Sequence, residues 1–133
     1  MKRLPFLLIP AAKDYLWGGS RLNDDFQLNI DVESFAEAWV CSTHPDGSSR
    51  LESGVDLKDA LKQEPEMLGS HVLQTTEGRA ELPILIKLID AKADLSVQVH
   101  PNDEYALRVE RSLGKTEMWY VLDAKATSTL VYG

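Results

Sequence analysis

The chain has 133 residues, of which 44% are hydrophobic and 26% are charged, and its formal net charge is -7. This is the composition of one globular domain, so it excludes a disordered chain. The acidic balance argues against non-specific binding to nucleic acid, and no segment has the roughly 20 apolar residues of a membrane-spanning helix.

The first third of the chain predicts short extended segments joined by turns. The apolar residues 6–9 lie between Pro5 and Pro10, which favours an edge strand or extended arm over a signal peptide. Residues 14–22 predict a turn around Gly18-Gly19, and residues 28–30 are weakly typical of a strand.

The next elements have stronger local signals. Residues 35–43 predict a strand, and the following His44-Pro45-Asp46-Gly47 predicts a tight turn. Residues 56–63 predict a helix with Asp56 as its N-cap, ending before Pro65. The apolar, branched residues 82–90 predict a buried strand.

The last third predicts three more strands and a short helix. Residues 95–100 alternate between polar and apolar, residues 103–112 suit a helix, and residues 117–122 and 127–132 predict strands. Together these elements predict a mainly β sandwich or barrel with short helices.

Three polar residues are candidates for a metal site. Period-two spacing places Gln98 and His100 on one face of a strand, and Glu117 could supply a carboxylate from a later strand. One nitrogen and two oxygens suit zinc, and also manganese or iron. By spacing alone, a polar strand face with an ordinary histidine is the simpler interpretation.

Other residues have both a structural and a functional interpretation. Lys87, inside an apolar strand, could extend its ammonium to solvent or bind an anion in a pocket. Ser96 could bind the same anion or be an ordinary strand serine. The lone Cys41 excludes an intrachain disulfide and fits a reducing cytoplasm, and His44 is typical of a polar turn.

Several segments in order resemble class I mannose-6-phosphate isomerases, most closely the short bacterial form. They cover almost the whole chain and are residues 14–19 (DYLWGG), 39–48 (WVCSTHPDGS), 82–91 (LPILIKLIDA), 95–106 (LSVQVHPNDEYA) and 114–124 (GKTEMWYVLDA).

This resemblance implies a cupin-like, jelly-roll β-barrel or part of one, with residues 1–133 as a single amino-terminal domain. It implies one zinc ion per chain, held by Gln98, His100 and Glu117, in an enzyme of carbohydrate metabolism that interconverts mannose 6-phosphate and fructose 6-phosphate. Lys87 and Ser96 match residues that line the substrate pocket, and Lys115 lies beside a ligand, so both lysines are catalytic candidates.

One departure from the family lowers the expected activity. The family supplies a fourth ligand, a histidine, and a catalytic arginine from later in the chain, whereas no histidine follows His100 and no arginine follows Arg111. We therefore expect a truncated, impaired isomerase that forms a homodimer to cover exposed sheet edges. The alternative is a non-catalytic cupin-like domain that binds a metal or a sugar phosphate and self-associates.

Overall fold

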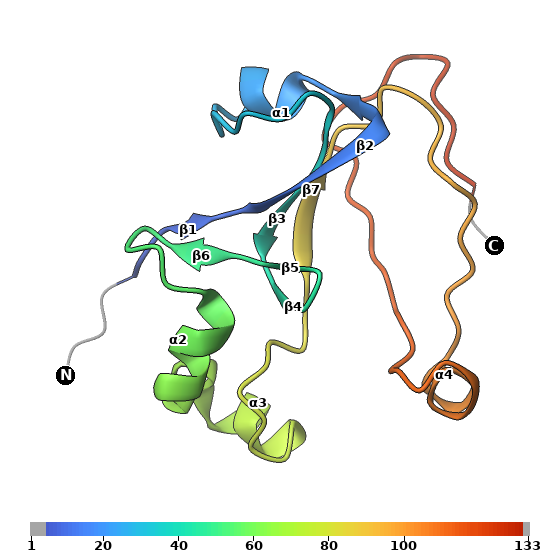
Figure 1. Cartoon of the computed structure of the whole chain (residues 1–133). Coiled ribbons are helices and arrows are strands. Elements are labelled where there is room, and N and C mark those ends of the chain that lie inside the picture. The colour runs from blue at the N-terminus through green and yellow to red at the C-terminus, as the bar shows by residue number, and fades with distance from the viewer. Residues whose placement is uncertain (1–4, 132–133) are drawn as a thin grey trace. The chain divides into compact units, whose positions relative to one another are not determined.

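A computed structural model describes residues 5–131 of the chain (Figure 1). Two compact units divide it, one ending at Leu95 and the other beginning at Ser96. No helix in the described part of the chain is long and apolar enough to cross a membrane.

An antiparallel three-stranded sheet organises the first unit. Its central strand, β3 (Phe35–Cys41), pairs with β2 (Ala11–Gly19) on one side and with β7 (Ile86–Ile89) on the other. The start of β3 is buried, and its Phe35 and Ala38 pack with Leu22 from α1 (Arg21–Asp24) to form the core. The predicted strand over 35–43 is confirmed as far as Cys41, where β3 has a hydrogen-bonded strand on each side. It is interrupted at Ser42, and Thr43 begins β4.

Two small ladders extend this unit. Strand β1 (Leu8–Ile9) pairs with β6 (Arg50–Leu51), and β4 (Thr43–His44) pairs with β5 (Gly47–Ser48). The second ladder is the hairpin that the Pro45-Asp46 turn predicted, and the first confirms an extended segment near the amino end.

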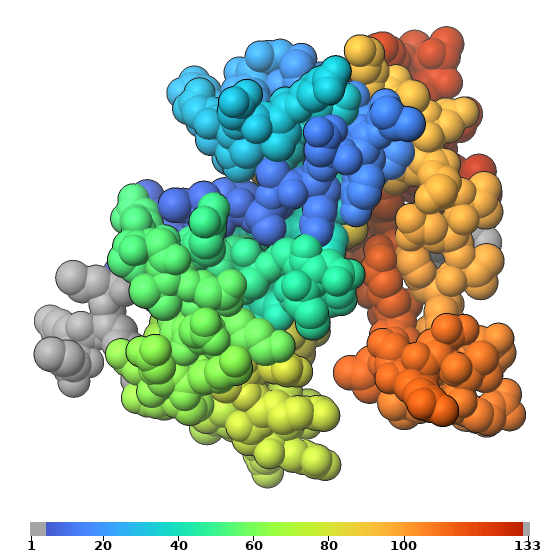
Figure 2. All heavy atoms as spheres, in the orientation of Figure 1, coloured from blue at the N-terminus to red at the C-terminus, as the bar shows by residue number. Residues whose placement is uncertain are grey.

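Three helical segments follow. Helix α2 (Leu57–Gln63) is capped by Asp56, whose side chain accepts a hydrogen bond from the Lys58 N–H, as predicted. Its residues, green in Figure 2, lie directly against the teal β4–β5 hairpin, and the Leu57 N–H donates to the Ser49 carbonyl at 2.8 Å. The sequence patterns did not predict η1 (Pro65–Leu68) or α3 (Gly69–Thr75).

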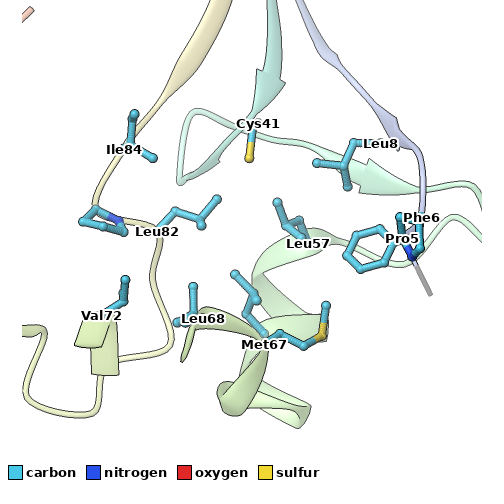
Figure 3. A pocket seen from close by; sticks show the side chains of 12 residues that line it. Pro5, Phe6, Leu8, Cys41, Leu57, Met67, Leu68, Val72, Leu82 and Ile84 are labelled. Carbon is cyan, nitrogen blue, oxygen red and sulfur yellow. The ribbon is translucent and has the colours of Figure 1, made fainter. Parts of the chain in front are cut away.

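An apolar cavity of about 540 Å³ lies between these helices and the ends of the strands (Figure 3). Phe6, Leu57, Met67 and Ile84 are among its lining residues, together with the only cysteine, Cys41. Burial raises the pKa of the Cys41 thiol, which keeps it protonated. None of the residues proposed for the metal or the substrate lines this cavity.

The sequence patterns misplaced several elements of the first unit. Gly18 and Gly19 end strand β2 instead of forming a turn. Gly19 stands opposite Phe35, as Asp14 does, so the ladder with β3 is interrupted between these two residues. No strand forms at 28–30, where Asn29 has a φ of 53°. The strand predicted over 82–90 is limited to Ile86–Ile89, the residues that face β3.

The second unit contains one helix in its described residues, α4 (Asp103–Val109). It confirms the first part of the helix predicted over 103–112, which ends early beside Arg111 with a φ of 55°. The strands predicted at 95–100, 117–122 and 127–132 are not formed in the described residues. Alternating side chains favour extended chain, but a strand also needs a hydrogen-bonded neighbour. Tyr132 lies outside the described residues.

Candidate metal centre

His100 and Glu117 meet in the second unit although 17 positions separate them. The Nε2 atom of His100 lies 2.9 Å from Oε2 of Glu117, and the two side chains are 25% and 26% exposed. A carboxylate oxygen only accepts hydrogen bonds, so the imidazole nitrogen is the donor in this contact. Two of the three predicted ligands therefore face each other.

Glu117 has further partners. Lys115 Nζ lies 2.5 Å from its Oε1 atom, and the indole N–H of Trp119 points to Oε2 at 3.4 Å. Burial alone would raise the pKa of Glu117, but the hydrogen bonds from Lys115, His100 and Trp119 outweigh it and lower the pKa to about 2. The side chain is therefore an anion at neutral pH, which is the form that ligates a cation.

Gln98 and Ser96 lie on the approach to His100. The Gln98 amide nitrogen donates to the Ser96 hydroxyl at 3.3 Å, and both residues are exposed. This contact confirms that residues at i and i+2 share a side here. The hydrogen bond involves the amide nitrogen of Gln98. The amide oxygen, the atom that would ligate a metal, takes no part in it.

The donor set suits zinc. An imidazole nitrogen and a carboxylate oxygen are common zinc ligands, and an amide oxygen could add a third. Residues 5–131 contain no group of three histidine, cysteine, aspartate or glutamate side chains able to hold a metal. A zinc site in these residues would therefore need the amide of Gln98 or a water as a ligand beside His100 and Glu117.

Lys87 belongs to the first unit, on β7. Its ammonium pairs with Oε2 of Glu37 at 3.1 Å, and the exposed fractions of the two side chains are 20% and 9%. The same oxygen accepts the indole N–H of Trp39 at 2.7 Å, and the ammonium of Lys13 lies 4.3 Å from the centre of the Trp39 ring. The Lys87 ammonium is therefore held in place by an ion pair, on a side chain that is only partly exposed.

Sequence reasoning did not identify Glu37, Trp39 or Lys13 as neighbours of Lys87. A weak signal for the first two exists, because period-two alternation places Glu37 and Trp39 on one face of the strand predicted over 35–43. The strand register supplies the rest, since Trp39 stands opposite Lys87, and Glu37 stands opposite Lys13.

The chain matches the family described as phosphomannose isomerase type I, catalytic domain, over residues 6–129. It is 38% identical to mannose-6-phosphate isomerase ManA of Bacillus subtilis and 37% identical to mannose-6-phosphate isomerase of Streptococcus mutans. Each match covers 97% of this chain and 40% of the relative, so the chain spans less than half of their length.

Solved structures give the same result. The mannose 6-phosphate isomerase of Bacillus subtilis matches with a TM-score of 0.79 and 39% identity, over 92% of this chain and 39% of that one. A Salmonella typhimurium mannose 6-phosphate isomerase with bound fructose 6-phosphate and zinc matches with a TM-score of 0.67 and 34% identity, over 80% and 28%. Other Salmonella matches carry single substitutions at a histidine, a lysine or a glutamate.

These matches confirm the predicted fold class, a mainly β, cupin-type fold or part of one with short helices. The three sheets and the short helices of the described residues agree with it. The chain belongs to the type I phosphomannose isomerase family.

Proposed function

We propose that this chain provides zinc-binding and substrate-binding residues of an isomerase that interconverts mannose 6-phosphate and fructose 6-phosphate. The observation that carries the proposal is the distance of 2.9 Å between His100 Nε2 and Glu117 Oε2. The family resemblance had already implied that these two residues are zinc ligands. The zinc and fructose 6-phosphate in the Salmonella relative support the choice of metal and substrate.

We assign Gln98, His100 and Glu117 as the protein ligands of one zinc ion per chain. When bound, zinc would polarise oxygens of the sugar and stabilise the negative charge that develops on them as a proton moves between C1 and C2. The position of the Glu117 carboxylate beside His100 supports this assignment, and its low pKa keeps it ready to bind a cation even in mildly acidic solution.

Lys115 is the residue that we place nearest to the chemistry. Its ammonium bonds Glu117 and could also donate to a sugar oxygen bound beside that carboxylate. Two of the Salmonella substitutions are at a lysine and a glutamate two positions apart, which is the separation of Lys115 and Glu117.

Lys87 and Ser96 are proposed to bind the substrate. The ion pair with Glu37 restrains the Lys87 ammonium on β7, and such a point charge suits a phosphate. The Ser96 hydroxyl accepts from Gln98 and still has its own hydrogen to donate.

A coupled assay for fructose 6-phosphate, run on the pure 133-residue chain with zinc, tests the catalytic part of the proposal. We expect zinc binding, because a water can fill the fourth zinc position. We expect little or no turnover, because in these 133 residues no histidine follows His100 and no arginine follows Arg111. Turnover at the rate of a complete relative would refute the expected impairment. Absence of zinc binding would refute the ligand assignment.

Exposed apolar side chains in the second unit support self-association, which we propose both for the impaired isomerase and for the alternative, a non-catalytic cupin-like domain that binds a metal or a sugar phosphate. Val97 is 97% exposed, Met118 92%, Tyr120 82% and Val131 96%. Such surface usually becomes buried against a partner, and we propose a second copy of the chain. Sedimentation equilibrium tests this proposal: a homodimer is expected, and a stable monomer would contradict it.

A further inference from the structure

Besides the contact between His100 and Glu117 themselves, two hydrogen bonds join the segments that carry these residues. The Asp103 Oδ1 atom accepts the N–H of Gly114 at 2.8 Å, and the N–H of Lys115 donates to the carbonyl of Pro101 at 3.2 Å. We call this pair of bonds the ligand clamp. Pro101 and Asp103 lie one and three positions after His100, and Gly114 and Lys115 lie three and two positions before Glu117.

Close packing accompanies these bonds. A Cβ atom on Gly114 would lie 2.6 Å from the Pro101 carbonyl oxygen and 2.7 Å from the Asp103 nitrogen, so only glycine lets the returning chain approach the turn this closely. The cap of α4 comes from another residue, because the Asn102 side chain accepts the Tyr105 N–H at 3.0 Å. The Asp103 carboxylate is therefore available for the clamp.

The clamp replaces a missing β-ladder. No strand pairing joins 96–101 to 114–131, and the bond from Lys115 to Pro101 is the one backbone–backbone hydrogen bond between these described stretches. Apart from this bond and the His100–Glu117 contact, a side chain supplies the further link that holds the backbone of the second segment at a defined offset. Asp103 supplies it from 11 positions before Gly114 in the chain.

We propose that Asp103 is a positioning residue for the zinc site, which it serves by holding Gly114, and with it Glu117, beside His100. The inference rests on the proposed function in that it takes His100 and Glu117 as zinc ligands. Asp103 contacts neither ligand in the described hydrogen bonds and acts through the backbone of Gly114.

Zinc affinity, measured by competition with a chelator on the full 133-residue chain, tests the proposal. Asp103→Ala should weaken zinc binding about tenfold, in the range usual for groups that orient metal ligands. Asp103→Asn keeps an oxygen that can accept the Gly114 N–H, so it should restore most of the affinity. Glu104→Ala is the matched control, because it removes a neighbouring carboxylate from the same helical turn and should leave affinity unchanged.

A second measurement needs no zinc. The Gly114 amide should be protected from hydrogen exchange in the wild-type chain, and the protection should be lost in Asp103→Ala and kept in Asp103→Asn. The proposal is overturned if the wild-type Gly114 amide exchanges as fast as neighbouring exposed amides. It is also overturned if folded Asp103→Ala binds zinc as tightly as Glu104→Ala, or if Asp103→Asn loses as much affinity as Asp103→Ala.

The two proposals fail in distinguishable ways. A wild-type chain that binds no zinc refutes the proposed function and the zinc part of this inference, while Gly114 exchange still judges the clamp. A wild-type chain that binds zinc with an unprotected Gly114 amide refutes the clamp alone. If Asp103→Ala does not fold, the wild-type exchange and the Asp103→Asn affinity decide.

Discussion

Replacing Glu37 with glutamine should destabilise the first unit by removing the counter-charge of Lys87. The exposed fractions of the two side chains, 9% for Glu37 and 20% for Lys87, place this pair between two limits. Exposed ion pairs contribute about 0–1 kcal/mol, and breaking a buried pair costs about 3–5 kcal/mol. Because Lys87 reaches solvent and a glutamine can still accept the Trp39 N–H, we expect the free energy of unfolding to fall by about 2 kcal/mol.

Urea unfolding at neutral pH, followed by tryptophan fluorescence, measures this change. Glu33→Gln, at an exposed position shortly before β3, is the control and should change stability by less than about 0.5 kcal/mol. In the double variant Glu37→Gln/Lys87→Met no charge is left without its partner, so its loss should be smaller than the sum of the single losses by about 1 kcal/mol. Equal effects of Glu37→Gln and Glu33→Gln would refute the reasoning.

Three further predictions concern the zinc ligands, the close approach of Gly18 to Ala36 and the apolar core. His100→Ala should abolish zinc binding measured by chelator competition, whereas His71→Ala, on exposed α3, should leave it intact; unchanged affinity in His100→Ala would discard the ligand set. Gly18→Ala should abolish cooperative unfolding in circular dichroism, because its Cβ atom would lie 2.6 Å from the Ala36 nitrogen; a stable variant would contradict this packing. Leu57→Ala should cost about 2–4 kcal/mol in urea unfolding, since Leu57 is 3% exposed and borders the apolar cavity, and a loss below about 1 kcal/mol would mean that the site collapses.

Elements with strong local signals could be predicted from the sequence. The Asp56 cap of α2, the Pro45-Asp46 turn and the start of α4 depend on residues within a few positions of one another, so their structure follows from local sterics and hydrogen bonds. The resemblance added the family and the ligand set Gln98, His100 and Glu117, which spacing by itself left as an ordinary polar strand.

Tertiary structure decided what depends on distant partners. Alternation at 95–100 and 117–122 predicted strands, but no neighbouring strand pairs with them in the described residues, so no ladder forms there. Gly18 and Gly19 were predicted as a turn, but they end β2, where Gly19 stands opposite Phe35 of β3.

The meeting of His100 with Glu117 and that of Glu37 with Lys87 are decided in the same way. The second pair spans 50 positions and is set by the register of β3 against β7, and the first is held by Asp103 and the absence of a side chain at Gly114. The sequence by itself determined which residues could ligate a metal or bind an anion. Which of these residues meet is determined by the tertiary structure, which brings together segments that are far apart in the sequence. Local propensities act over only a few residues, so they cannot encode such contacts.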